Sequence, residues 1–200
     1  SDNKERIKVL NNIEKEIAEI EKYCDERLNA WNDDIGLYTE FLNDNLNVES
    51  IKNITSSKGR IEFNLIYYRD FEPPMNRYNS MISSGDLKFI KSEKIKETLT
   101  RLHNLNYSNL KTSVEYEKSL KQELINILTE NHSEILFAAD SYKTSIEIYS
   151  SLLHKSIQSD QELKSNLLIQ MKYFKSRVSL LKLYMYTLDE LKSEVENSLD

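Results

Sequence analysis

Turn-forming residues are scarce in this chain, and most of them lie in one short stretch. Both prolines, Pro73 and Pro74, and one of the three glycines, Gly85, fall between Phe71 and Ile90. A β-sandwich or a doubly wound α/β fold needs far more turns than these residues can supply. The rest of the chain must therefore form long elements with few interruptions.

Apolar side chains recur at intervals of three and four residues along most of the chain, which is the period of an amphipathic helix. We expect a first helix over about residues 3–43 with one apolar face. That face would consist of Ile7, Leu10, Ile13, Ile17, Ile20, Cys24, Leu28, Trp31, Ile35, Tyr38 and Leu42. Gly36 lies inside this helix, weakens it by about 1 kcal/mol relative to alanine and favours a bend. A bundle core and the seam of a dimeric coiled coil both account for such a face.

Three more long helices are expected from the same period. They should cover about residues 93–130, 135–157 and 161–198, and we expect Ser133 to cap the second and Ser159 or Asp160 to cap the third.

Two shorter regions are less regular. A short helix is expected near residues 49–55. Residues 61–70 fit a strand or a helix, and we favour a helix because no partner strand is visible. Within the helix at 93–130, Asn104, Asn106 and Asn109 predict a local irregularity.

Together these segments predict an all-α fold. We expect an elongated, mostly antiparallel helical bundle of about four long helices, with a short helical insert bounded by proline and glycine. The bundle should form a single domain over residues 1–200, with the insert at about residues 44–91.

The stretch around the prolines should form a corner. Pro73 and Pro74 end the preceding element, and a short helix over about residues 75–83 should follow. Gly85 is suited to the left-handed conformation that ends a helix, and Ser92 should cap the next one. Apolar residues near the corner are expected to face inward or to cover the end of the bundle: Tyr78, Met81, Ile82, Leu87, Phe89 and Ile90.

Charge and apolar content exclude some classes of protein. The formal net charge is −6, so we expect no nucleic acid among the partners. No apolar run of 18 residues is present, so no segment of this chain should span a membrane. The chain begins at Ser1 without a methionine, and we expect it to be part of a longer protein whose membrane segment is absent here.

The residues that catalysis or metal binding would need are not arranged for it. None of the three histidines, His103, His132 and His154, is preceded by Glu at the spacing of a di-iron bundle. Cys24 lies on the apolar face of the first helix, which favours a buried structural thiol over a nucleophile. No glycine-rich phosphate loop is present. We therefore expect no catalytic residue, metal or cofactor.

The corner itself is the candidate site. We expect Arg77, Tyr78, Gly85 and Asp86 to form either a binding site or a purely structural corner. Three arginines flank this stretch and could bind a small carboxylate or pair with neighbouring acids: Arg69, Arg77 and Arg101, with Asp70, Glu72 and Asp86 as the expected acids. Several tyrosines could line a ligand cleft or pack at the rim of the helices: Tyr67, Tyr68, Tyr173, Tyr184 and Tyr186.

Part of this stretch resembles the signature of an uncharacterised bacterial family that is common in Bacteroidetes. The resemblance rests on five features: Phe71-Glu72-Pro73, then Tyr78, then the continuous run Ile82–Lys91 with Ser83-Ser84-Gly85 in it, and finally Ile95 and Leu99. The charged helix over Lys4–Lys22 is also similar to the helix that follows the membrane anchor in that family. The resemblance implies an N-terminal transmembrane anchor and a soluble part outside the cytoplasmic membrane. It supplies no catalytic residues.

Three functions fit these observations. The first is a non-enzymatic, extracytoplasmic (periplasmic) helical domain of a membrane-anchored bacterial protein that binds a protein partner or self-associates. The second is a periplasmic small-molecule sensor domain of a chemoreceptor or sensor kinase. The third is a cytoplasmic coiled-coil dimer.

Overall fold

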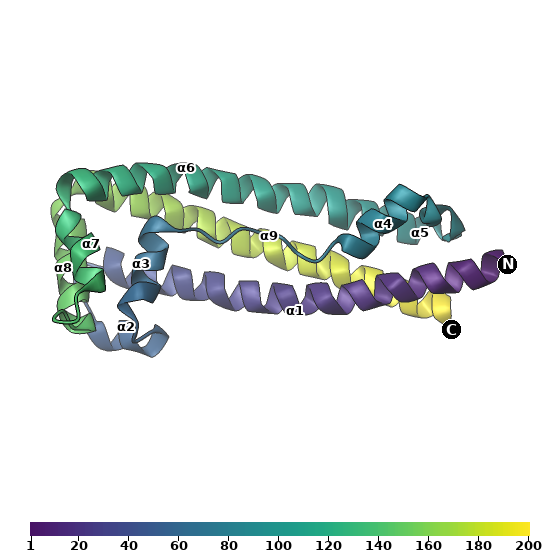
Figure 1. Ribbon diagram of the computed structural model, residues 1–200, viewed down its shortest axis with the longest axis horizontal. Helices are drawn as coiled ribbons and strands as arrows, with labels where there is room; N and C mark the ends of the chain where they lie inside the picture. Colours follow the sequence, from purple (N-terminus) through teal and green to yellow (C-terminus); the bar gives the residue numbers. More distant parts are fainter. The chain divides into compact units, whose positions relative to one another are not determined.

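The computed structural model describes all 200 residues, and every regular element in it is helical (Figure 1). The long α-helices are α1 (Asp2–Leu42), α6 (Tyr107–Asn131) and α9 (Gln161–Leu199). The shorter ones are α2 (Val48–Ile54), α3 (Lys58–Ile66), α4 (Asn76–Ser84), α5 (Glu93–Thr100), α7 (Ser133–Asp140) and α8 (Ile146–Ser159). A 3₁₀ turn, η1 (Asp86–Phe89), follows α4, and a π-helical segment, η2 (Arg101–Asn106), joins α5 to α6. The expected all-α helical bundle is confirmed.

The chain divides into two compact units. The first unit comprises Ser1–Asn29, Phe71–Lys111 and Ser179–Asp200, and the second comprises Ala30–Asp70 and Thr112–Val178. Helices α1, α6 and α9 each contribute residues to both units. The expected insert is divided between them at Phe71. A single domain over residues 1–200 stays a prediction.

The first unit has an apolar core between segments of α1, α5 and α9. Within this unit the α9 segment runs antiparallel to the α1 segment (Figure 1). The buried residues from the expected face of α1 are Leu10, Ile13, Ile17, Ile20 and Cys24. Ile7, which the pattern places on the same face, is 38% exposed.

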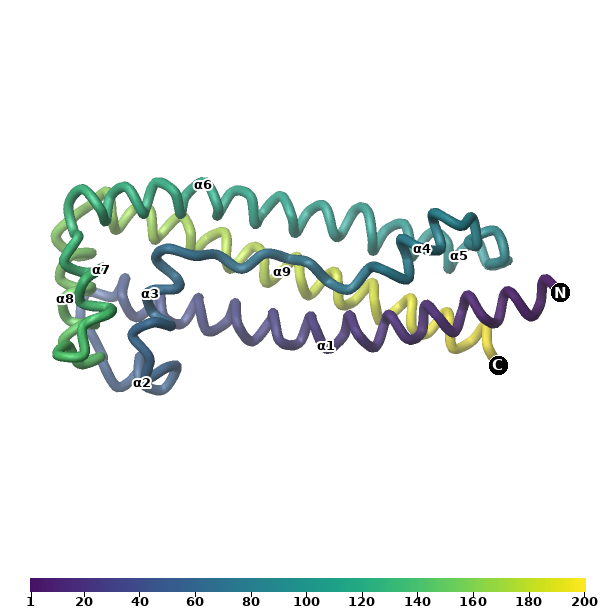
Figure 2. The backbone as a smooth tube through the Cα atoms, viewed as in Figure 1, coloured from purple at the N-terminus to yellow at the C-terminus, as the bar shows by residue number.

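Phe71 anchors the chain where it enters the first unit. Its ring is fully buried, with centroids 5.7 Å from Tyr23, 6.1 Å from Tyr107 and 5.1 Å from Tyr184. The backbone trace is extended from here to the start of α4 (Figure 2). The next residue, Glu72, donates its backbone N–H to the Tyr23 hydroxyl at 2.7 Å. The aromatic cluster thus fixes the segment that carries the two prolines.

The second unit is built around segments of α1, α6 and α9, with α2, α3, α7 and α8 packed at one end of them (Figure 1). Its core includes Tyr38, Phe41, Tyr149 and Phe174. Helix α1 continues through Gly36 without a break, and the expected bend there stays a prediction. A Cβ at Gly36 would lie 2.9 Å from Ile54 Cδ1, so the glycine lets α2 approach α1 closely.

Two expected helices differ from the sequence pattern: one ends early and the other is interrupted. The helix expected over residues 61–70 stops at Ile66, and Tyr67–Asp70 are extended. The helix expected over residues 135–157 is broken into α7 and α8. Lys58 Nζ donates to the carbonyls of Ala138 (2.9 Å) and Ser141 (2.6 Å) at the end of α7, and Ser145 caps α8. These contacts satisfy backbone groups that the break leaves unpaired.

The other sequence-based boundaries are largely correct. The irregularity expected near Asn104 is the π-helical segment η2. Ser92 caps α5, and Asp160 caps α9 by accepting from Leu163 N at 3.2 Å. Ser133 does not cap α7, because it is the first helical residue and His132 occupies the cap position.

No helix in the structure has the length and apolar character that crossing a membrane requires.

Candidate functional site

The expected corner is built on a carboxylate from α1. Glu16 accepts the backbone N–H groups of Arg77 at 2.7 Å and Tyr78 at 3.1 Å, the second and third residues of α4. Met75, at the cap position of α4, offers no side-chain hydrogen bond, so Glu16 takes that role from a distant part of the sequence. Burial raises the pKa of Glu16 above its ordinary value.

Tyr78 connects α4 to the π-helical segment. Its ring stacks on His103, with centroids 3.9 Å apart and an interplanar angle of 16°. Burial lowers the pKa of His103 to about 4, so the imidazole is neutral at pH 7. Its Nδ1 atom has no hydrogen-bond partner. Glu16, Tyr78 and His103 line one small cavity whose remaining walls are apolar.

Gly85 and Asp86 form the other side of the corner. Gly85 has φ +77° and ends α4 in the left-handed conformation, as the sequence predicts. Asp86 begins η1, and its side chain lines a shallow groove together with Arg77. The other polar residues of this groove are Asn12, Asn76, Ser80 and Ser84. The structure therefore brings Arg77 and Asp86 to one polar groove between α1 and α4.

Other residues near the corner differ from expectation. Met81 and Ile90 are buried, but Ile82 is 51% exposed because it lies on the solvent side of α4. Leu87 and Phe89 are half-buried. Cys24 is fully buried, and burial raises the pKa of its thiol to about 12.

The three flanking arginines all have acidic partners, but on the long helices. Arg77 lies 2.6 Å from Glu19, and Arg101 lies 3.3 Å from Glu190. Arg69 lies 3.0 Å from Asp34. The carboxylates in these three pairs thus come from the long helices, and Glu72, one of the expected acids, pairs with Lys111 at 2.7 Å instead. Among the tyrosines, Tyr184 is buried, whereas Tyr67 and Tyr186 are exposed.

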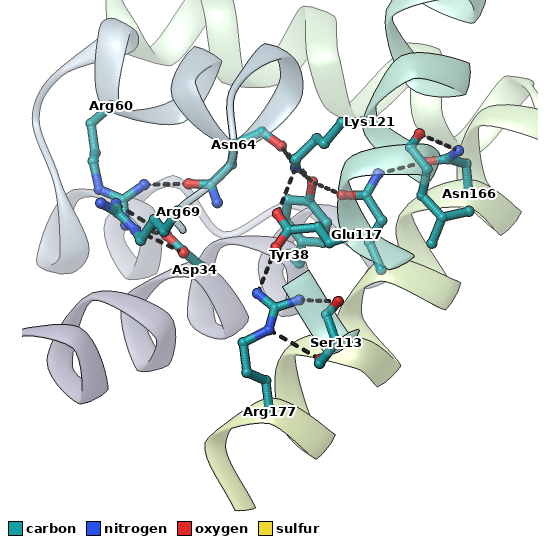
Figure 3. Close-up of polar contacts among 12 residues, drawn as sticks. Asp34, Tyr38, Arg60, Asn64, Arg69, Ser113, Glu117, Lys121, Asn166 and Arg177 are labelled. Carbon is teal, nitrogen blue, oxygen red and sulfur yellow. Dashed lines mark hydrogen bonds and ion pairs between the residues drawn. The ribbon is translucent and has the colours of Figure 1, made fainter. Parts of the chain in front are cut away.

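A buried polar network that the sequence analysis missed occupies the second unit (Figure 3). At one side, the Asp34 carboxylate accepts from Arg60 Nη2 at 2.6 Å and from Arg69 Nε at 3.0 Å. The guanidinium of Arg69 also lies over the Phe63 ring, 4.5 Å from its centroid. Asp34 thereby ties α1 to α3 and to the extended segment after α3.

At the other side of the network, α9 is tied to α6. Arg177 is fully buried and donates to Glu117 Oε1 at 2.5 Å. It also donates to the side chain of Ser113 at 3.1 Å and to its carbonyl at 3.0 Å. The Trp31 and Phe174 rings flank the guanidinium, with centroids 5.2 and 5.6 Å away. These contacts satisfy a charge that would otherwise be costly to bury.

Lys121 joins α6 to α1 and α3. Its Nζ donates to the Tyr38 hydroxyl at 2.7 Å and to the backbone carbonyl of Asn64. The Tyr38 hydroxyl in turn donates to that carbonyl at 2.5 Å. Burial lowers the pKa of Lys121 to about 8, although the nearby Glu117 carboxylate, 3.8 Å away, opposes the shift. Burial also raises the pKa of Tyr38.

A signal for this network exists in the sequence. Ser113, Glu117 and Lys121 recur every four residues on α6, so they share one face of the helix. All three are buried. The network is a set of mutually satisfied groups inside the core, and it holds four elements in register.

Large apolar side chains are exposed to solvent around the turn between α7 and α8. Phe137 on α7 is 77% exposed, Tyr142 in the turn is 93% exposed and Ile148 at the start of α8 is 59% exposed. We call these three residues the apolar tip. Five consecutive residues of α7, from Ile135 to Ala139, are apolar, and Phe137 is the one among them that is exposed, because Leu136 and Ala138 are partly buried against the core.

Three comparisons with known proteins found no relative of this chain. No protein-family model matches the chain, and neither a curated protein nor a solved structure does so. The resemblance to the Bacteroidetes family stays a prediction. The structure contains no group of three or more His, Cys, Asp or Glu side chains that could hold a metal ion.

Proposed function

We propose that this chain is a non-enzymatic helical domain that acts by binding a protein partner or by assembling with other copies. The apolar tip carries the proposal, because Phe137, Tyr142 and Ile148 are each more than half exposed within one helix–turn–helix segment, and apolar side chains that gather on a surface mark interaction sites. The buried charges of the second unit support it as well. Glu117 pairs with both Arg177 and Lys121 inside the core, so these charges serve the fold rather than a substrate.

A photoreactive crosslinker tests this proposal inside cells that express the full-length gene. The crosslinker replaces Phe137 in one variant and Tyr186 in the control, since Tyr186 is an exposed aromatic residue of α9 in the first unit. We expect a discrete adduct from position 137 and none from position 186. No adduct at position 137, or turnover of a substrate that a single change in the polar groove abolishes, contradicts the proposal.

The cellular setting is a further part of the proposal. We infer that the domain is the extracytoplasmic, periplasmic part of a membrane-anchored bacterial protein, on the basis of the family resemblance around Tyr78 and Gly85. The full-length gene tests this inference. A transmembrane segment encoded before Ser1, with a stop codon near Asp200, is the expected result. A gene without any membrane segment would overturn it.

The alternative is a small-molecule sensor domain, and the polar groove between α1 and α4 favours it. Arg77, which also pairs with Glu19 at 2.6 Å, and Asp86 line this groove, and a small zwitterion that displaces Glu19 would meet one charge of each sign there. A sensor requires a second transmembrane segment after Asp200, followed by a signalling module. The same reading of the gene therefore separates the two functions.

A further inference from the structure

We propose that His103 is an acid-sensitive switch for α4: a proton taken up by its imidazole releases this short helix from the first unit. His103 belongs to the π-helical segment η2, is 4% exposed, and has one face of its ring covered by Tyr78 of α4. Helix α4 has no side-chain cap of its own. Both residues belong to the first unit, so the switch is independent of the apolar tip.

The surroundings of the imidazole do not stabilise a positive charge. The cavity at His103 is lined by α1, α4, α5, η2 and α9, and its walls are apolar apart from Glu16, Tyr78 and His103 itself. The Nδ1 atom of the imidazole has no hydrogen-bond partner, and the ring stacks on Tyr78 with centroids 3.9 Å apart. A charge is costly in such a place unless a counter-ion compensates it. Burial accordingly lowers the pKa of His103 to about 4.

The carboxylates around this site already have partners. Glu16 accepts the backbone N–H groups at the start of α4, Glu19 pairs with Arg77, and Glu190 pairs with Arg101. Helix α5 contributes the apolar Leu99 to the cavity. The charged and titratable groups around the site come from four elements: Glu16 and Glu19 on α1, Arg77 and Tyr78 on α4, Arg101 on η2, and Tyr184 and Glu190 on α9. A proton on His103 would therefore gain no dedicated counter-ion while α4 stays in place.

Release of α4 takes the Tyr78 ring away from His103 and lets water reach the imidazole, whose pKa then returns toward about 6.5. Between pH 6.5 and pH 4 the open form binds the proton more readily than the closed form, so acid favours the open form. With these two pKa values, His103 alone raises the ratio of open to closed chains about 20-fold from pH 7 to pH 5. Glu16 acts in the opposite sense, because burial raises its pKa in the closed form.

Amide hydrogen exchange, corrected for the intrinsic effect of pH, tests the switch in the full chain. The probe is Asn79 in α4, whose N–H donates to the Met75 carbonyl at 2.9 Å. His103→Phe keeps an aromatic ring against Tyr78 but cannot take up a proton, and it leaves the contribution of Glu16 unchanged. From pH 7 to pH 5 we expect protection at Asn79 to fall about 20-fold more in the natural chain than in His103→Phe. Tyr149 in α8 reports the second unit, and its protection should change equally in both chains.

A titration of the His103 ring by NMR provides a second measurement that does not depend on the His103→Phe variant. We expect a pKa of about 4 in the natural chain. Tyr78→Phe, which keeps the stacked ring, should leave this pKa unchanged, whereas Tyr78→Ser uncovers the imidazole and should raise it toward about 6.5.

Three results would overturn the switch. The first is a His103 ring that titrates near 6.5 in the natural chain. The second is the same pH dependence of Asn79 exchange in the natural chain and in His103→Phe. The third is the same His103 pKa in Tyr78→Ser and Tyr78→Phe, which would show that α4 does not keep water from the imidazole.

Discussion

Arg177 on α9 and Glu117 on α6 form an ion pair at 2.5 Å inside the second unit, and both side chains are almost completely buried. Breaking such a pair by removing one partner leaves a charge without compensation. Glu117→Gln should therefore lower the free energy of unfolding by about 3 kcal/mol, measured by urea denaturation. The double variant Arg177→Met/Glu117→Leu should cost less than the sum of its two single changes. A loss below about 1 kcal/mol for Glu117→Gln would show that the pair is not buried.

The contact between Glu16 and the start of α4 predicts a local effect. Glu16→Ala removes the acceptor of two backbone N–H groups, those of Arg77 and Tyr78. Loss of a helix cap costs about 1–2 kcal/mol. Amide hydrogen exchange should become faster at these two residues than in α8, which serves as an internal reference. Unchanged exchange at both would mean that another group caps α4.

Gly85 and Gly59 provide a matched pair of substitutions. Gly85→Ala should destabilise the protein by about 1 kcal/mol, because φ is +77° at this residue and an L-residue is strained in that conformation. The added Cβ meets no neighbour within 4 Å, so a steric clash adds nothing to this cost. Gly59 lies in α3, where an added Cβ makes only an ordinary contact with Ser57 Oγ at 3.5 Å. Gly59→Ala should therefore raise stability, by up to about 1 kcal/mol. Equal melting temperatures for the two variants would contradict the left-handed conformation at Gly85.

Lys121 predicts a dependence of stability on alkaline pH. Its pKa of about 8 in the folded chain lies below the ~10.4 of an exposed lysine, so between these values only the unfolded chain binds the proton. The free energy of unfolding should therefore rise with pH in this window. From pH 7.5 to pH 9.5 the natural chain should gain about 2 kcal/mol relative to Lys121→Met. A constant difference between the two chains would show that Lys121 titrates normally.

The sequence was sufficient for the helices and for much of the core. Apolar residues at three-and-four spacing identified α1 and α9, and the asparagines near residue 104 indicated the irregularity that is the π-helical segment. Local chemistry also identified Gly85 and the cap at Ser92 correctly. These features depend on residues that are close together in the chain, which is why their pattern is readable.

Contacts between distant residues could not be predicted in the same way. Nothing in the local sequence indicates that Lys58 would bind the end of α7, so the break between α7 and α8 was missed. Glu16 reaches α4 from sixty residues away for the same reason. Within the candidate site, the sequence identified the positions of Arg77 and Gly85 but not the partners that hold them. The polar face of α6 was readable from its spacing, but only the fold reveals that it is buried.

The account depends most on Phe137 facing outward, and one measurement tests this directly. The free energy of unfolding of Phe137→Ser can be compared with that of the natural chain at a concentration where both are monomeric. We predict a difference within about 0.5 kcal/mol, as for an exposed position. The buried Leu181 sets the scale, since Leu181→Ala should cost about 2–5 kcal/mol. A loss of that size for Phe137→Ser would place the ring in the core and leave the chain without the proposed interaction surface.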